Sequence, residues 1–370
     1  MTKKLLALAV AGAFAAPFTA AADSVTIYGT LNMSIDFTEA DGAANPANNI
    51  DSTQQISCSS CNIGFRGEED LGGGLKAWFQ LESGIDPDEG SGTLTSRNSA
   101  VGLRGGWGTF LVGRWDTPHK LNINAKTPFF ATTTAGYNAI LGYDGGLGVA
   151  ANSVGNFDNR QGNSIQYWSP TFAGGLTGRL MYTTRTDSST VAQNNGTPNT
   201  AGESDGWGVS LAWDAKNLYA GAAYEKHNDA GVGPTSLDQE AYSFNLSYAF
   251  MGKYRVGVIY ENQDFDLPAG GSTDRDAFYI FAVLPVGPGA IHASYANADD
   301  WDGRPDSGAD VWSIGYYYDL SKRTKVYIQY TQLDNDSNAA YRLAAGPGNR
   351  LQPALGADPQ AFSLGVRHQF

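Results

Sequence analysis

Two cysteines, Cys58 and Cys61, stand three residues apart and are the only cysteines of the 370-residue chain. A closed zinc site needs four ligands, so this pair alone cannot form one. In an exported protein the pair favours a disulfide. An extended strand would hold the two Cα atoms about 10 Å apart, so the bond requires a local turn. A redox-active pair is the alternative, although no thioredoxin-like βαβ pattern surrounds it.

The histidines are the residues best suited to catalysis, and they are few. They are His119, His227, His292 and His368. A hydrolase would need a nucleophile beside a histidine and an orienting carboxylate or amide. The chain has no Gly-x-Ser-x-Gly elbow to present such a nucleophile. An enzyme is therefore a remote alternative, and we expect no catalytic residues.

Aspartates crowd the stretch NADDWDGRPDSGAD (297–310), which could attract cations. They are Asp299, Asp300, Asp302, Asp306 and Asp310. Their spacing lacks the D-x-D-x-D-G-x5-E pattern of a calcium loop. Divalent cations that bind weakly and bridge to lipopolysaccharide are one interpretation, and a plain solvated loop is the other. We expect no other cofactor and no structural metal.

The first 22 residues predict export. A short basic start, an apolar run of about a dozen residues and a small-residue end form the pattern of a cleaved secretory leader. Pro17 interrupts the run, which is shorter than the roughly 20 residues of a membrane-spanning helix. The mature domain then covers 23–370. The chain carries a net charge of −13, which argues against nucleic acid as a partner.

Apolar and polar residues alternate from end to end, which predicts strands rather than helices. Segments such as 75–82, 207–213, 242–250 and 362–370 place apolar side chains at every second position. Aromatic residues tend to begin and end these apolar rows, as in the girdles of membrane barrels. Alternation alone also fits a soluble sandwich, so the lengths of the connections have to decide.

Short turns and long loops alternate strictly along the chain. Seven short turns fall at 68–73, 105–108, 170–175, 214–217, 251–253, 286–289 and 319–323. Eight long polar loops lie near 38–54, 86–96, 116–160, 187–205, 229–239, 264–275, 298–310 and 334–360. This rhythm is typical of an all-β, antiparallel transmembrane barrel, and the count predicts sixteen strands. We expect Glu68, Glu69 and Asp70 to lie in the first, solvated periplasmic turn.

A sixteen-stranded barrel is too wide for side chains to fill and leaves an aqueous channel. The sequence therefore predicts a passive diffusion pore for ions and small hydrophilic solutes. The connection 116–160 is too long for an ordinary loop of a compact domain. We expect this third loop to fold into the lumen and to constrict the channel.

Several motifs resemble those of the general porins of Gram-negative bacteria, in particular the neisserial and betaproteobacterial type. The matching pieces are VTIYG (25–29), GFRGEEDLGGGLKAWFQLE (64–82), RNSAVGLRGGWGTFLVGRWDTP (97–118), NSIQYWSPTFAGG (163–175) and the terminal Phe370. The resemblance implies an outer-membrane homotrimer of sixteen-stranded barrels, in contact with lipid and lipopolysaccharide. It also implies that Phe370 is the assembly signal read by the outer-membrane insertion machinery.

In the family that this chain resembles, acids on the third loop face basic residues on the wall of the constriction. The candidate acids here are Asp116, Asp144 and Asp158, and Lys126 is an additional base on the same loop. Asp116 has an alternative role, which is to cap or anchor the start of the loop.

Four arginines are candidates for the basic wall. Arg160 matches a wall arginine of the family, and its parity with Gln166 indicates a lumenal position. Arg97 also matches, but it shares a face with apolar neighbours and would need a bulge or a rim position. Arg114 matches with an ambiguous orientation, and Arg185 is a candidate from parity alone.

Asn62 departs from the family pattern, because the sequences that this chain resembles carry an arginine at that place. Its parity with Arg66 points it into the lumen. The missing base, the acidic loops and the net charge lead us to expect a weakly cation-selective or neutral pore. A channel specific for one acid, sugar or aromatic solute is the alternative, and it would need a ladder of wall residues.

Overall fold

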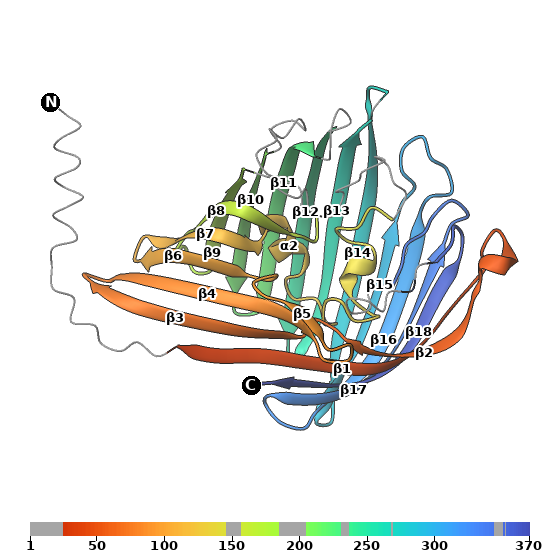
Figure 1. The fold of residues 1–370 in the computed structure, drawn as a ribbon, viewed down its shortest axis with the longest axis horizontal. Coiled ribbons are helices and arrows are strands. Elements are labelled where there is room, and N and C mark those ends of the chain that lie inside the picture. The colour runs from red at the N-terminus through yellow and green to blue at the C-terminus, as the bar shows by residue number, and fades with distance from the viewer. Residues whose placement is uncertain are drawn as a thin grey trace.

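A computed structural model of the chain describes residues 25–145, 157–184, 205–230, 237–267, 269–343, 351 and 353–370. Within them the strands form one antiparallel sheet that closes on itself, because β1 (Thr26–Asp41) pairs with β18 (Asp358–Gln369) (Figure 1). The fold is therefore the barrel that the sequence predicts. The leader expected at 1–22 and Arg185 lie outside the described residues.

The elements between the first and last strands are mostly strands. In chain order they are β2 (Ile50–Cys58), β3 (Asn62–Gly72), β4 (Leu75–Asp86), β5 (Ser91–Thr93), β6 (Ser99–Gly105), β7 (Gly108–Asp116), β8 (Arg160–Trp168), β9 (Leu176–Thr183), β10 (Asp205–Ala215), β11 (Leu218–Ala230), β12 (Leu237–Phe250), β13 (Tyr254–Asp266), β14 (Ser272–Val286), β15 (Gly289–Ala298), β16 (Ala309–Asp319) and β17 (Thr324–Asn335). The helical segments are η1 (Pro46–Asn48), α2 (Pro118–Ile123) and η2 (Tyr137–Ala139). No helix among the described residues is long and apolar enough to cross a membrane.

Two of the barrel strands are interrupted. β2 and β3 both pair with β1, and β5 and β6 both pair with β4, so each couple forms one barrel strand with a break in it. The barrel therefore has sixteen strands, which confirms the number predicted from the turns and loops. The strands reach further than expected at the first external loop, which covers 42–49 rather than 38–54.

The expectation of a solvated acidic turn at 68–70 is wrong, because these residues lie within β3. Asp70 pairs in register with Lys76, and the Lys76 ammonium contacts the Glu68 carboxylate. The Arg104 guanidinium lies 3.2 Å from the second oxygen of Glu68. Opposite charges on neighbouring strands favour pairing, so the strands continue and the glycines that follow make the reversal.

The alternation along the strands separates an outer apolar surface from an inner polar one. Exposed aliphatic and aromatic side chains on the outer face include Ile35, Leu211, Phe244, Leu246, Ile280, Ile314, Ile328 and Leu364. The residues between them are small or polar and face inward, among them Ser243, Asn245, Gln329, Thr331 and Ser363. Lipid can solvate only the apolar surface, so this arrangement suits a barrel that spans a membrane with a wet interior.

Carboxylates gather on the outer face at the external ends of β12 to β16. We call Glu240, Asp264, Asp274, Asp276 and Asp310 the acidic rim. Glu240 lies opposite Asp264, and Asp264 lies opposite Asp274. Tyrosine hydroxyls below the rim donate to it, as from Tyr260 to Asp276 at 2.6 Å. The rim concentrates negative charge near the external mouth.

The connection between β7 and β8 lies inside the barrel, as the position of α2 within the ring of strands shows (Figure 1). Its apolar residues pack against inward-facing residues of β13 to β17. The loop side of this cluster includes Ile123, Tyr137, Ile140 and Leu141, and the wall side includes Ile259, Tyr279, Phe281, Val311 and Leu333. Burial of these side chains holds the loop against this part of the wall.

Candidate functional site: the channel constriction

The constriction loop begins at a well-defined helix cap. Thr117 accepts a hydrogen bond from the Lys120 backbone N–H at 3.1 Å, and Pro118 occupies the first helical position. Threonine at the cap and proline just after it both favour helix initiation. Thr117 therefore caps α2, and Asp116 is left free to act as a charged group in the lumen.

A cavity of about 350 Å³ lies between the loop and the wall. Its wall side includes Asn32, Asn62, Arg97, Arg160 and Arg367. Its loop side includes Lys120, Phe130, Ala131, Thr132 and Asp158, and Asp116 lies where wall and loop meet. The structure thus brings together five of the residues selected from the sequence, namely Asn62, Arg97, Asp116, Asp158 and Arg160.

Asp116 is the centre of an ion-pair network. The Arg160 Nε lies 3.1 Å from its Oδ1, and the Lys120 Nζ lies 3.6 Å from the same atom. The Asn98 side-chain amide donates to the other carboxylate oxygen at 2.6 Å. The two bases offset the charge of the carboxylate, and the Arg160 Nε–H donates a hydrogen bond to the Asn98 side-chain oxygen at 3.0 Å.

Asp158 closes the same network at the end of the loop. Its carboxylate lies 3.2 Å from the Lys120 Nζ and accepts hydrogen bonds from the Tyr137 hydroxyl and the Asn138 amide. Burial, together with the neighbouring Asp158 charge, raises the pKa of Tyr137 well above its usual value, so this hydroxyl remains a donor. Asp158 therefore lines the cavity between the loop and the wall.

Arg97 faces the cavity because it precedes β6 instead of lying in its regular alternation. Its guanidinium pairs with Glu82, which also accepts a hydrogen bond from the Tyr28 hydroxyl at 3.0 Å. Strand parity placed Arg97 on the same face as apolar neighbours. The break between β5 and β6 removes Arg97 from that alternation, so its side chain can face the cavity.

Two bases of the cavity were missed in the sequence. Lys120 stands one helical turn after Asp116, a spacing that allows an ion pair once α2 is recognised. Arg367 lies in the polar row of the last strand, next to Asn32 in register. The Phe130 ring lies 4.2 Å from its guanidinium carbon, and no carboxylate among the described residues lies against it. The alternation of the last strand could have identified Arg367 as lumenal.

Three further candidates lie away from the cavity. Arg114 donates from Nε to the Ser96 carbonyl at 3.1 Å and lies near Arg160. Lys126 does not line the cavity, because its ammonium reaches Asp214 at 2.8 Å on the other side of the loop. Asp144 does not line it either.

Asp144 is buried behind the loop, where its charge interacts with Arg275 and Tyr341. The side chain therefore belongs to the packing of the loop against the wall. Arg185, as noted, lies outside the described residues. Among the described residues, no group of three or more His, Cys, Asp or Glu side chains is arranged to hold a metal ion.

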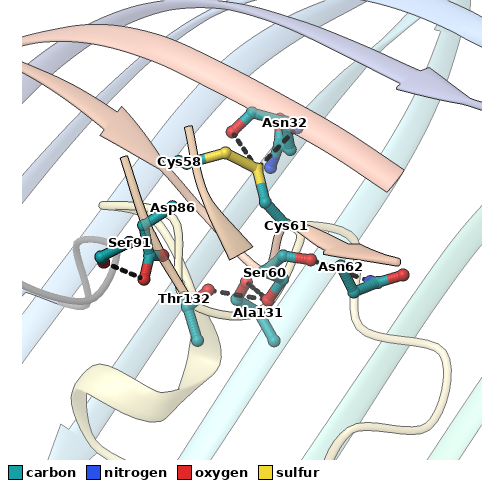
Figure 2. Close-up of a disulfide and its surroundings, with 9 residues drawn as sticks. All are labelled: Asn32, Cys58, Ser60, Cys61, Asn62, Asp86, Ser91, Ala131 and Thr132. Atoms are coloured by element: carbon teal, nitrogen blue, oxygen red, sulfur yellow. Dashed lines mark hydrogen bonds between the residues drawn. A yellow bond between two sulfur atoms is a disulfide. The ribbon is translucent and has the colours of Figure 1, made fainter. Parts of the chain in front are cut away.

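Cys58 and Cys61 are joined by a disulfide at the edge of the cavity (Figure 2). Their Cα atoms lie 5.7 Å apart, which the local turn at Ser59 and Ser60 makes possible. Ser60 lies in the left-handed region with φ of 56°. The bond is therefore part of the wall that faces the constriction loop.

The sequence matches the model of the Gram-negative porin family over residues 7–338. The chain belongs to this family. Outer membrane porin protein 32 of Delftia acidovorans is 30% identical to it, with both chains covered in full. The major outer membrane protein P.IB of Neisseria gonorrhoeae is 26% identical over 92% of this chain and 95% of the relative. The resemblance seen in the motifs is thereby confirmed.

Solved outer-membrane proteins share the fold. The anion-selective porin from Comamonas acidovorans superposes with a TM-score of 0.75 and 26% sequence identity, covering 94% of this chain and all of that one. OmpT of Vibrio cholerae in its trimer form gives 0.65 at 17% identity and covers 94% of this porin. The porin is thus an outer-membrane β-barrel channel, and the Delftia and Comamonas proteins are named as porins and not as enzymes.

Proposed function

We propose that this porin is a passive diffusion channel for ions and small hydrophilic solutes, and that its constriction prefers anions. The observation that carries the proposal is the charge of the cavity. Arg97, Lys120, Arg160 and Arg367 line it, against Asp116 and Asp158. One further acid, Glu82, pairs with Arg97 from behind.

The bases outnumber the acids even when Glu82 is counted. Lys120 engages both Asp116 and Asp158, and Arg97 and Arg160 are paired with Glu82 and Asp116. Among the described residues of the cavity, Arg367 is thus the base that faces an entering ion without a carboxylate partner. Arg367 supplies a positive charge close to Asn62, where the family pattern would lead one to expect an arginine. The expectation of a weakly cation-selective or neutral pore came from the missing base at Asn62, the acidic loops and the net charge, and it has not been tested. The constriction itself favours the opposite sign, and the Comamonas relative is described as anion-selective.

Reconstitution in planar bilayers tests this proposal. A KCl gradient across the membrane should give a reversal potential of the sign expected for chloride preference. Absence of any conductance from the folded protein would refute the channel. A reversal potential of the opposite sign would refute anion preference while leaving the channel in place.

A channel with a preferred aromatic anion is the second candidate, favoured by a separate cavity of about 460 Å³ on the wall. Trp78, Trp115 and Trp168 line it, together with Arg66 and Arg104. Indole rings offer stacking surfaces, and the Arg66 guanidinium offers a partner for a carboxylate, whereas Arg104 is paired with Glu68, which also lines the cavity. Saturable block of the current by benzoate but not by acetate would support this candidate, and equal effects of the two would remove it.

We also propose the assembly that the family resemblance implies. The porin would be exported with cleavage after about residue 22, assemble as a homotrimer and contact lipopolysaccharide. The terminal Phe370 would act as the signal for the insertion machinery, and its backbone already pairs with Gly29. N-terminal sequencing of the mature protein and its mass in mild detergent test the leader and the trimer.

We also propose weak binding of divalent cations at 297–310, where few carboxylates are free to act as ligands. Asp300 is occupied within the loop, since it accepts from the backbone N–H groups of Asp306, Ser307 and Gly308. Asp299 and other exposed carboxylates would have to supply the site. Calorimetry with calcium and magnesium tests it, and the absence of any heat of binding would dispose of it.

A further inference from the structure

The wall beside the constriction carries one extra residue at the break between β2 and β3. Met33 of β1 pairs with Cys58, and Thr30 of β1 pairs with Asn62. Between these two pairs, β1 has two residues and the opposite strand has three. Such a β-bulge disrupts the ladder locally and turns a side chain in a direction that regular alternation forbids.

The disulfide closes this bulge. Cys58 and Cys61 flank the two serines, and both cysteines are buried. Asn32 of β1 binds the turn from both sides: its carbonyl accepts from the Ser59 N–H at 2.9 Å, and its N–H donates to the Cys61 sulfur at 3.2 Å. The turn is therefore fixed to the barrel wall by a covalent bond and by two hydrogen bonds.

Ser60 is the residue that the bulge turns towards the constriction loop (Figure 2). Its hydroxyl donates to the Ala131 carbonyl at 2.9 Å and lies 2.7 Å from the Thr132 hydroxyl. Both Ser60 and Thr132 hold positive φ, at 56° and 65°. Non-glycine residues keep this conformation only where their surroundings impose it, so the contact is a constrained one.

Further anchors of the loop lie on other strands. Thr134 contacts Ser363 of β18 and Gln329 of β17, and the Gly142 N–H donates to Glu261 of β13. Ser60, in the turn between β2 and β3, supplies two hydrogen-bonding contacts to the loop, at Ala131 and Thr132. This contact spans the cavity beside Asn62 and Arg97, so it bounds the opening on one side.

We propose that the disulfide-closed bulge at Cys58–Cys61 is the positioning element of the constriction. By presenting Ser60 to Ala131 and Thr132, it holds the loop against the β1–β3 wall and sets the width and the ion selectivity of the pore. The proposal rests on the channel function proposed above. It adds an uncharged contact, between Ser60 and the loop, to the charged residues that line the cavity.

Single-channel recording of C58S/C61S in planar bilayers tests the proposal. Without the bond the bulge relaxes, Ser60 loses its fixed direction, and the loop segment gains freedom. We expect the mean conductance to rise roughly 1.5-fold, because conductance follows the open width of the pore, with greater open-channel noise and weaker anion preference. Thermal unfolding should change little, because the disulfide closes only a short ring and the pairing of β1 is retained.

Two outcomes separate this inference from the channel function. If the wild type conducts and C58S/C61S shows the same conductance, noise and reversal potential, the inference is overturned and the channel function stands. A wild type that does not conduct would overturn both. If C58S/C61S fails to fold, the serine variants described next decide the matter.

S60A and S60G remove the hydroxyl in two ways, and S57A is the matched control. Glycine accepts positive φ without cost, so S60G removes the contact and also relieves the backbone. We expect both Ser60 variants to raise the conductance and the noise, while S57A, whose hydroxyl has no described partner, leaves them unchanged. T132V should add little to S60A, because the two changes remove one contact. Wild-type currents in S60A and S60G would overturn the inference.

Discussion

The acidic rim and the constriction carry opposite charges on the same barrel. Rim carboxylates lie on the outer face of β12 to β16, and several stand directly opposite one another across neighbouring strands. The constriction lies in the lumen, and its acids are each held by a base within ion-pair distance. The net charge of −13 therefore says little about the path of an ion.

The two regions differ in how their charges are compensated. At the rim, water and counter-ions screen the carboxylates over about 8 Å at physiological ionic strength. At the constriction, the partner is built into the wall, as Arg160 is for Asp116. The position of an ion along the channel, and not the net charge of the protein, decides whether the nearby side chains attract or repel it.

The largest expected effect is that of R367E. It reverses a charge in the cavity that has no carboxylate partner among the described residues, so no described ion pair is broken. We expect the anion-to-cation permeability ratio to fall on the order of five- to tenfold, as a two-unit change a few ångströms from an ion would produce. Reversal potentials in a KCl gradient measure it.

R304E is the matched control, because it makes the same charge change in the external loop 299–308. Its effect on the permeability ratio should be much smaller. Equal shifts in R304E and R367E would contradict the distinction between the two regions.

N62R should strengthen the preference of the constriction for anions. Asn62 lines the cavity, so the longer arginine side chain can extend into the lumen. The substitution removes the hydrogen bond that the Asn62 amide donates to the Ser60 carbonyl at 3.0 Å. We expect a roughly threefold rise in the permeability ratio from one added charge. A ratio unchanged from the wild type would mean that position 62 does not act on passing ions.

Changes in ionic strength should distinguish the effect of the acidic rim on ion selectivity from that of the constriction, without any mutation. At about 0.01 M salt the screening length grows to about 30 Å, so the rim acts on ions well beyond its own surface. We expect anion preference to weaken as salt is lowered and to recover above about 0.1 M. Recordings over a salt series measure this, and anion preference that grows on dilution would show that the rim does not act on the mouth.

The smallest expected effect is that of pH. Burial, followed by the neighbouring Asp276 and Asp300 charges, raises the pKa of Asp299, and burial with Asp300 and Asp306 raises the pKa of Asp336. These external carboxyls thus become neutral at a higher pH than ordinary aspartates, while the arginines stay charged. Anion preference should therefore increase slightly as the external pH falls from 7 towards about 4.

The double variant D299N/D336N tests the cause of this pH effect. Both side chains are then neutral at every pH, so the change in reversal potential on acidification should be reduced. An undiminished pH effect in this variant would assign it to other groups.

The barrel could be predicted from the sequence because its rules are local. Alternation assigns each side chain to lipid or lumen, and the turn and loop lengths fix the strand number. The same parity placed Asn62 and Arg160 correctly in the lumen. Parity does not apply to the third loop. Lys126 and Asp144 were selected there as charged residues of a loop that resembles the constriction loop of the family, and neither lines the cavity.

The remaining misses depend on breaks in regular structure and on contacts across the lumen. Arg97 reaches the cavity through the interruption before β6, and Ser60 reaches the loop through the bulge. Neither break can be recognised from the alternation of apolar and polar residues, because an extra residue shifts that alternation in the rest of the strand. The Glu68 ion pairs likewise became visible only once the register of β3 and β4 was known.

The seam between β1 and β18 governs when this molecule can fold. Gln360 donates to Glu39 across 321 residues of chain, and the pairing continues to the last residues. Contacts so distant in sequence form slowly, and until they form the sheet has two open edges that invite aggregation. Closure must therefore await release of the complete chain. We expect the unclosed polypeptide to depend on chaperones that keep it soluble before it enters the membrane.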